Sequence, residues 1–564
     1  MRKPLWAGLL SLIAGLILAA NAAGLEANRD VGGSKLVQKP EQRVINDLVA
    51  DMLKYYHYTR HELDDSLSAR IYERYLEVLD PNRIYFLQQD IDSFEKFRDV
   101  LDDHIKAQNV EPAFVIYRVF QERIDARFEH AIKLLETEPR FNVDETYVFD
   151  RREHEWAKSR RELNEIWRMR VKNDAIGLIL TDKTWDEARE TLKNRYTNFR
   201  RRIGQVKSED VFEIFINAYA YVMDPHTEYF SPRDSEEFQI RMSLSYEGIG
   251  AALQNQNEYV TVMRILPGGS ADKTGLLKEN DRITGVAQGD EEVMTDVIGW
   301  RLDDVVQLIR GPANSVVRLR ILPAGEAPGA PEKAIRLVRS EIKLEEQAAQ
   351  KKVVEVEREA NNYRVGVIEV PAFYLDFKAL QAGEANYRST TRDVRRLLKE
   401  LEKESVEGII IDLRNNGGGS LWEATELVSL FIDKGPVVQV RNSDGKIQLF
   451  EDREAGIEYM GPLMVLVNRY SASASEIFAG AIQDYGRGLV VGSTTYGKGT
   501  VQTLVDLKRR NGWKIKNKEP GQLKLTTGKY YRVTGASTQH QGVIPDIILP
   551  SAIDPEIVGE SAQE

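Results

Sequence analysis

Three serines, Ser471, Ser473 and Ser475, lie within five residues, after a short apolar run and before a helical pattern. A serine at the start of a helix faces backbone N–H groups and the positive end of the helix dipole, which stabilise a nearby negative charge. Helix capping is the structural alternative, because serine caps helices often. One cap needs only one serine, so the cluster indicates a nucleophile. The spacing alone leaves open which serine that is.

A serine nucleophile needs a base. Histidine is the usual base, but six of the seven histidines lie between His57 and His226, and only His540 lies in the same part of the chain as the serines. The sequence therefore gives little support for a Ser-His-Asp triad, because only one histidine lies in that part of the chain.

Lys498 is the other candidate base, and it lies between two glycines. Glycines allow close packing, which would bury the amine, disfavour the ammonium form and lower the pKa as a lysine base requires. Gln502 lies four residues on. Its amide could orient the amine without adding charge. These residues predict a serine–lysine site.

The glycine-rich loop Asp412–Gly419 follows an apolar strand pattern and precedes a helical one. Glycines let a loop turn sharply and present bare N–H groups, which could bind an anion or a developing oxyanion. A purely structural turn explains this loop equally well when it is taken alone.

The segment Gly492–Lys498 matches the phosphate-loop pattern up to its last position. A phosphate loop then requires Ser or Thr to hold Mg²⁺, whereas this chain has Gly499. Nucleotide binding is therefore not favoured.

The elements that must position these loops have an α/β pattern. Short runs rich in Val, Ile and Leu predict strands at Val365–Val370, Gly408–Leu413, Leu463–Val467 and Leu489–Val491. Helical patterns lie between and after them at Thr390–Lys403, Leu421–Ile432 and Ser473–Tyr485. Buried strands alternating with helices predict a mainly parallel sheet covered by helices, with ligands bound beyond the carboxyl ends of the strands.

Two further regions precede this one. Residues from about Lys39 to Phe230 have a helical pattern, in which Asp80-Pro81 and Asp224-Pro225 each begin the same short motif. We expect a recurring helix-end turn there, since proline cannot continue a helix. A strand-rich module follows, with strands predicted at Tyr259–Leu266, Asp281–Val286 and Ser315–Ile321 and a helix at Asp303–Arg310. Residues 322–333 are rich in Pro, Gly and Ala and predict a loop or linker.

Composition and the N-terminus restrict the class of protein. The net charge of −11 does not favour nucleic-acid binding, which would need a basic face. The absence of cysteine excludes thiol proteases, thiolate metal sites and lipid-anchored lipoproteins. Arg2 and Lys3, the apolar run 5–20 and the small-x-small site ending at Ala22 predict a secretory signal peptide. The run is shorter than the roughly 20 residues of a membrane-spanning helix.

The chain resembles the tail-specific, or C-terminal-processing, serine proteases, a family with periplasmic members in Gram-negative bacteria. The motifs that carry the resemblance span nearly the whole chain: Asp224–Thr227, Tyr246–Gly250, Val297–Val306, Asp412–Gly419, Ser471–Glu476, Gly497–Gln502 and Gly542–Asp546. The serine and lysine motifs are highly specific together. Relatives typically continue past this last motif into a long helical extension, whereas here only Ile547–Glu564 follow.

The resemblance implies a role for each matching residue. Ser473 would be the nucleophile, Lys498 the general base and Gln502 the third member of the arrangement, while the backbone N–H groups of Gly419 and Ala474 would form the oxyanion hole. No metal or cofactor is implied.

The family also implies a PDZ domain that binds substrate C-termini, with Gly248, Ile249 and Gly250 as the loop that holds the terminal carboxylate. The expected substrates are periplasmic proteins with accessible apolar C-termini. By analogy, a tetratricopeptide lipoprotein would be an adaptor. The expected location is the periplasm, either free or peripheral to the inner or outer membrane.

The expected protein is thus a multidomain α+β protein. Its predicted parts are a signal peptide over 1–22, a helical domain over 23–235, a PDZ domain with linker over 236–345, an α/β core of the crotonase/ClpP-like kind over 346–550 and a tail over 551–564. The expected activity is that of a secreted serine endopeptidase. An inactive PDZ scaffold that only binds protein C-termini is the main alternative, and a nucleotide-binding α/β protein is the weaker one.

Overall fold

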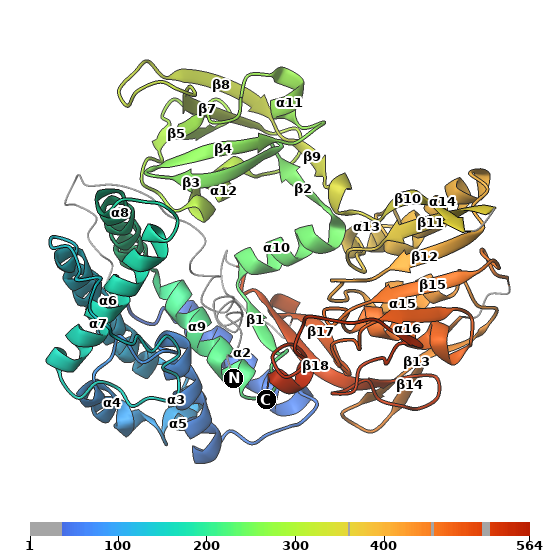
Figure 1. Ribbon diagram of the computed structural model, residues 1–564, viewed down its shortest axis with the longest axis horizontal. Coiled ribbons are helices and arrows are strands. Elements are labelled where there is room, and N and C mark those ends of the chain that lie inside the picture. The colour runs from blue at the N-terminus through green and yellow to red at the C-terminus, as the bar shows by residue number, and fades with distance from the viewer. Residues whose placement is uncertain (1–35, 359–360, 453–455, 510–518, 564) are drawn as a thin grey trace. The chain divides into compact units, whose positions relative to one another are not determined.

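The computed structural model describes residues 36–358, 361–452, 456–509 and 519–563 (Figure 1). The predicted signal peptide lies outside these residues. The chain forms two compact units. The first contains the described residues up to Ala50 together with His61–Val222 and Glu247–Ile342, and the second contains Asp51–Arg60, Met223–Tyr246 and the chain from Lys343 onward. No helix of the described residues is both long and apolar enough to cross a membrane.

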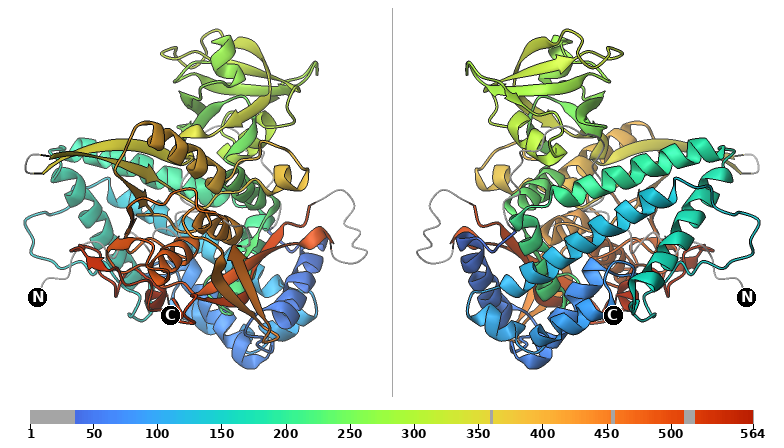
Figure 2. Two further views of the ribbon diagram at one scale, coloured as in Figure 1. Left: turned by 90° about the vertical axis from the view of Figure 1, so that its right-hand side faces the viewer. Right: turned by 90° about the vertical axis from the view of Figure 1, so that its left-hand side faces the viewer.

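The N-terminal part is helical, as the sequence predicts. Its helices are α2 (Pro40–Tyr56), α3 (Asp65–Leu79), α4 (Gln88–Phe94), α5 (Leu101–Lys106), α6 (Glu111–Leu134), α7 (Arg160–Ile179), α8 (Trp185–Gly204) and α9 (Ser208–Tyr221). The long helices α6, α7 and α8 pack against one another, as the cyan and teal helices in the right-hand view of Figure 2 show. Local signals set the helix starts: Thr184 and Glu187 form a capping box at α8.

The strand-rich module of the first unit is a β-domain with one sheet, in the order β3-β4-β5-β7-β8 with β6 beside β5. Its elements are β3 (Ala251–Gln256), β4 (Tyr259–Ile265), α11 (Ser270–Thr274), β5 (Arg282–Gln288), β6 (Thr295–Asp296), α12 (Leu302–Ile309), β7 (Val316–Leu322) and β8 (Lys333–Val338). The three predicted strands and the predicted helix are all present. Among the described residues strand β3 pairs with β4 alone, so its other edge is free within the sheet.

The second unit contains the predicted mixed α/β core. Its main sheet has the order β10-β11-β12-β15-β16-β19, and it is parallel from β11 to β19 while β10 pairs with β11 in antiparallel fashion. The strands are β10 (Gln350–Arg358), β11 (Asn361–Glu369), β12 (Gly408–Asp412), β15 (Leu463–Val467), β16 (Leu489–Gly492) and β19 (Ile547–Ile548). The helices are α13 (Phe377–Gln381), α14 (Thr390–Lys403), α15 (Leu421–Val428) and α16 (Ala474–Asp484).

A second, antiparallel sheet in this unit is not predicted by the sequence patterns. It has the order β1-β18-β13-β14 with β17 beside β18. Its strands are β1 (Glu228–Phe230), β13 (Gly435–Asn442), β14 (Ile447–Asp452), β17 (Thr500–Asp506) and β18 (Gln522–Tyr531). Helix α15 contacts β13 and β14, and α16 contacts β13 and the parallel strand β16 (Figure 1). These helices therefore pack between the two sheets, and buried residues of all these layers form one hydrophobic cluster.

Helix α10 (Pro232–Ser243) follows β1, and the short strands β2 (Ser245–Gly248) and β9 (Ser340–Lys343) pair with each other.

The two Asp-Pro motifs are both turns after a helix, as expected. The Asp80 carboxylate follows α3 and accepts the N–H of Ile84 at 2.8 Å, and that of Asp224 follows α9 and accepts the N–H of His226 at 2.8 Å. The second turn does more than end a helix, because Asp224 also binds the ring of His57 at 2.5 Å. Both turns follow a helix and are closed by the aspartate carboxylate, but they differ in backbone, since Arg83 has φ 50° while Thr227 at the same place of the motif has no positive φ.

Candidate active site

Ser473 stands directly before helix α16, with φ 55° and ψ −113°. A side-chain-bearing residue rarely adopts such a backbone conformation, which costs on the order of 1–3 kcal/mol and clusters at functional sites. The two neighbouring serines are engaged elsewhere. Ser471 Oγ donates to the carbonyl of Leu413 at 2.8 Å, and Ser475 Oγ donates to that of Asn416 at 2.9 Å. Both hold the glycine loop, which leaves Ser473 as the candidate nucleophile.

Lys498 has the lowered pKa that its sequence context predicts. Burial, followed by repulsion from the Lys524 ammonium, lowers the pKa of Lys498 from 10.5 to about 8. Attraction to Glu560, Asp224 and Glu476 opposes part of this shift. The residue keeps some surface exposure, as a base that meets substrate requires. A large fraction of its amine is therefore neutral under mildly alkaline conditions.

Glu476 joins the serine and lysine motifs. Its carboxylate accepts the backbone N–H of Ser473 at 2.8 Å, of Lys498 at 3.0 Å and of Gly497 at 2.7 Å, as well as the Thr495 hydroxyl at 2.6 Å. Burial raises the pKa of this fully enclosed carboxyl from 4.5 to about 7, although the four donors oppose the shift. One side chain thus holds the two loops in register.

Tyr530 holds the same two loops from their carbonyl side. Its hydroxyl hydrogen-bonds the carbonyl oxygen of Lys498 and lies 3.3 Å from that of Ser473. Thr538 Oγ1 also donates to the Lys498 carbonyl, at 3.0 Å. The backbone around both candidate residues is therefore fixed on two sides.

The glycine loop packs directly against Ser473. A Cβ on Gly418 would lie 2.9 Å from the Cβ of Ser473 and 3.1 Å from the nitrogen of Ala474. Gly418 and Gly419 have φ of +106° and +142°, which L side chains rarely adopt. Neither the N–H of Gly419 nor that of Ala474 has a hydrogen-bond partner among the described residues. Both N–H groups are thus available to an oxyanion.

Gln502 lies on β17, and its side chain does not reach Ser473 or Lys498 through a hydrogen bond in the described part of the chain. Its Nε2 donates to Thr500 Oγ1 at 3.0 Å and to Thr526 Oγ1 at 3.1 Å. The structure brings the backbones of Ser473 and Lys498 together through Glu476 and packs the glycine loop against Ser473. No hydrogen bond joins the Ser473 hydroxyl to the Lys498 amine among the described residues. The role of Gln502 as third member stays a prediction.

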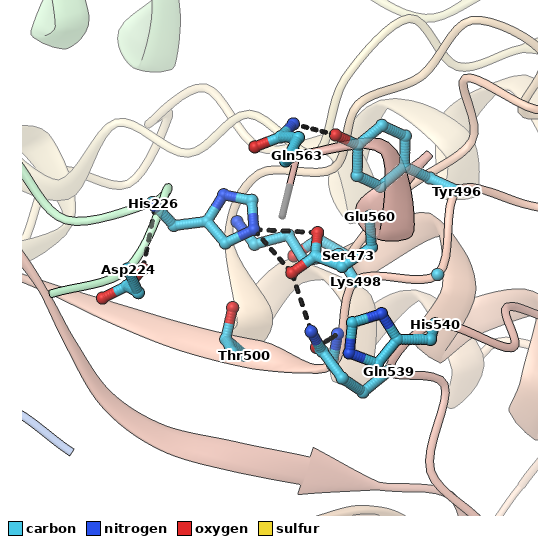
Figure 3. A network of polar contacts seen from close by, with 12 residues as sticks. Asp224, His226, Ser473, Tyr496, Lys498, Thr500, Gln539, His540, Glu560 and Gln563 are labelled. Atoms are coloured by element: carbon cyan, nitrogen blue, oxygen red, sulfur yellow. Dashed lines mark hydrogen bonds and ion pairs between the residues drawn. The ribbon is translucent and has the colours of Figure 1, made fainter. Parts of the chain in front are cut away.

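Two histidines that are distant in sequence lie in the second unit, which corrects the expectation that only His540 is available there. His226 Nε2 lies 2.9 Å from both carboxylate oxygens of Glu560. Glu560 also accepts from Gln539 at 2.8 Å, and Gln539 accepts the N–H of Gly499, next to Lys498, at 2.7 Å. Figure 3 shows this network around Ser473 and Lys498. No local sequence signal links His226 to Glu560.

The predicted carboxylate loop lies at the start of strand β3. Gly248 ends β2, and Ile249 and Gly250 lead into β3. The buried Ile249 accepts the N–H of Ala271 through its carbonyl at 2.9 Å, and a Cβ on Gly250 would lie 2.8 Å from the Cα of Gly269. The close approach of two backbones explains the glycine at this position.

Three family descriptions match the chain. "Tail specific protease N-terminal domain" covers residues 49–233, "PDZ domain" covers 237–322 and "Peptidase family S41" covers 364–549. The "Tail-specific protease" of Haemophilus influenzae is 40% identical over 509 residues, which are 90% of this chain and 70% of that protein. The chloroplastic C-terminal processing peptidase of Tetradesmus obliquus is 28% identical over 70% of this chain and 77% of that protein.

Two solved structures are also similar. The photosystem II D1 C-terminal processing protease is 28% identical over 66% of this chain and 88% of that chain, with a TM-score of 0.34. The PDZ domain of the carboxy-terminal protease from Vibrio cholerae, crystallised with a peptide, is 48% identical over 18% of this chain and 100% of that chain, with a TM-score of 0.17.

The α/β core and the sequence matches define the class, which is a serine peptidase of family S41 with a PDZ domain. Within that class the chain belongs to the tail-specific proteases, because its resemblance to the Haemophilus enzyme covers the helical part, the PDZ domain and the core.

Proposed function

We propose that this chain is an exported endopeptidase that recognises the C-terminal tails of protein substrates through its PDZ domain and cleaves them with Ser473 and Lys498. The observation that supports it most directly is Glu476, whose carboxylate binds the N–H groups of both Ser473 and Lys498. A buried acid in this position serves to bring these two loops together.

In the proposed mechanism, Lys498 takes the proton of the Ser473 hydroxyl as the oxygen attacks the scissile carbonyl. The N–H groups of Gly419 and Ala474 stabilise the negative oxygen of the tetrahedral intermediate. The Lys498 ammonium then gives its proton to the leaving amine, which produces an acyl-enzyme. Water next gives a proton to Lys498 and attacks the ester. The Lys498 ammonium then returns that proton to the departing Ser473 oxygen, which releases the new carboxyl terminus and restores the Ser473 hydroxyl.

Substrate recognition falls to strand β3 and the loop before it. The free edge of β3 can accept an extended peptide as an added strand, and the loop Gly248–Gly250 lies where the peptide carboxylate would end. Helix α12 contacts β3 and supplies the other wall. Such a site selects accessible apolar tails by main-chain pairing and by side-chain pockets.

The predicted signal peptide supports export, and the proposed location of this activity is the periplasm, either free or peripheral to a membrane. Periplasmic proteins with accessible apolar C-termini are the proposed substrates. A tetratricopeptide lipoprotein remains the proposed adaptor, by analogy with relatives.

The deciding experiment compares wild type with Ser473→Ala and Lys498→Ala on a folded reporter protein that ends in an apolar tail. Wild type should cleave, and both variants should bind the tail but lose cleavage by at least about a thousandfold. Binding without cleavage by wild type would instead support the inactive PDZ scaffold. Cleavage that survives Ser473→Ala would refute the assigned nucleophile.

A further inference from the structure

We propose that Thr526, backed by Asp224, is a positioning residue that fixes the orientation of the Gln502 side-chain amide. The inference rests on the proposed function, in which Gln502 completes the serine–lysine arrangement. It adds two residues from outside the serine, lysine and glycine motifs, one of them on β18 and the other in the turn before β1.

The strand register places Thr526 beside Gln502. Strands β17 and β18 are antiparallel, and their register shifts between Val501 and Gln502, so that Gln502 lies opposite Thr526. Such irregularities re-aim a side chain and are frequent near active sites. The shift brings the Gln502 amide to the Thr526 hydroxyl, where Nε2 and Oγ1 are 3.1 Å apart.

The hydroxyl of Thr526 has a single proton, which determines the partner to which Thr526 donates and the partner from which it accepts. Thr526 Oγ1 lies 3.1 Å from Asp224 Oδ1. Burial alone would raise the pKa of Asp224, but hydrogen bonds from His57 and Thr227 hold that pKa well below its usual value. The ionised carboxylate only accepts. Thr526 therefore donates its single proton to Asp224, and its oxygen must accept from Gln502.

This arrangement determines which way the Gln502 amide faces. One N–H points to Thr526 and the other to Thr500 Oγ1, at 3.0 Å. Both amide protons are then used, and the amide oxygen is the atom left to accept from the Lys498 ammonium. A reversed amide would instead present N–H groups to that ammonium and repel it.

Asp224 itself is held rigidly. The ring of His57, which is buried, contacts Asp224 Oδ2 through Nε2 at 2.5 Å. His57 Nδ1 accepts the N–H of Thr59 at 3.2 Å, so Nε2 carries the proton and donates to Asp224. Backbone N–H groups of His226 and Thr227 donate to Oδ1. The carboxylate cannot turn away from Thr526 without losing several of these bonds.

The test uses the full-length enzyme and the tailed reporter protein. Thr526→Val removes the acceptor for Gln502 while keeping the shape, and should lower kcat about tenfold with little change in KM. Thr526→Ser keeps the hydroxyl and should restore most of the rate. Thr503→Val is the matched control, because the Thr503 hydroxyl hydrogen-bonds that of Thr527 at 2.8 Å across the same two strands and makes no hydrogen bond to the Gln502 side chain among the described residues.

Asp224→Asn tests the same point without changing Thr526. Asp224 Oδ1 also accepts the backbone N–H groups of His226 and Thr227, so the asparagine oxygen should take this place and bind the Thr526 proton without a charge. The Gln502 amide is then held less firmly, and kcat should fall, though less than in Thr526→Val. The comparison is made at the pH plateau of kcat, because Asp224 also raises the pKa of Lys498. This variant decides the question if Thr526→Val fails to fold, as judged by its melting curve. Normal kcat in a folded Thr526→Val, or in Asp224→Asn, while Ser473→Ala is inactive, would overturn the positioning role and leave the proposed function intact. If Ser473→Ala cleaves like wild type, the proposed function itself fails.

Discussion

Replacing Lys498 with methionine should inactivate the enzyme and stabilise its fold. The folded protein lowers the pKa of Lys498, so it disfavours the ammonium that the unfolded chain carries freely. The unfolded chain therefore binds a proton at pH values where the folded state releases it. The free energy of unfolding of the wild-type protein then rises with pH between the pKa of Lys498 in the folded state and its pKa in the unfolded state. Below the folded-state pKa, the buried ammonium destabilises the fold by the full amount.

The size of the effect follows from the shift. A fall from 10.5 to about 8 corresponds to about 3 kcal/mol of unfolding free energy at about 1.4 kcal/mol per pKa unit. Water near the partly exposed residue makes this an upper value. Methionine has similar length and no charge, so Lys498→Met should gain up to about 3 kcal/mol at pH 7 and about 1.5 kcal/mol at pH 9.5.

The free energy of unfolding is measured at both pH values by urea denaturation monitored by circular dichroism. Hydrogen exchange of the backbone amides in β17 and β18 reports the local stability around Lys498. Both proteins carry Ser473→Ala, so that cleavage does not interfere. Lys446→Met on the β13–β14 turn is the control, because that lysine is exposed and should change little. A variant less stable than its parent at pH 7, or a gain that does not shrink at pH 9.5, would refute the argument.

Three further changes test the same site. Lys524→Met should move the acid limb of the kcat/KM profile to higher pH, since the Lys524 ammonium lowers the pKa of Lys498; an unmoved limb would contradict this electrostatic role. Gly418→Ala should abolish activity, because its Cβ would meet fixed backbone at positive φ, whereas Gly417→Ala meets nothing within 4 Å and should be tolerated; equal activities in the reporter assay would count against the packing argument. Glu476→Gln should cost about 2–3 kcal/mol in urea unfolding, because an amide N–H₂ would face backbone N–H donors; wild-type stability would show that the carboxylate is not needed.

Much of the core could be predicted because its patterns are local. The predicted strand Leu463–Val467 and helix Thr390–Lys403 agree with the structure at both ends. The antiparallel sheet was missed because its partners are distant, such as β1 with β18, and pairing between distant segments leaves no local pattern. Tertiary pairing of this kind is visible only in the folded chain.

The residues of the candidate active site also divide into those with a local sequence signal and those without one. Ser473 and Lys498 stand in specific motifs, and Glu476 could have been found as well, since an acid three residues after a serine before a helix is a capping signal. Nothing local connects His57 or His226 with the core. Chain order suggested that both histidines were remote, and the fold brings both into the second unit.

The discontinuous second unit also determines when an active enzyme can exist. Strand β1 is synthesised before the PDZ domain, yet its partner β18 and the residue Glu560 come near the end of the described chain. Domains generally fold as units, N-terminal ones first, while the chain is being made. The helical and PDZ parts can therefore fold early, whereas the core must wait for its last strands. A nascent chain that has not yet supplied β18 and Glu560 would thus carry no assembled core, and proteolysis would begin only after these segments have been made.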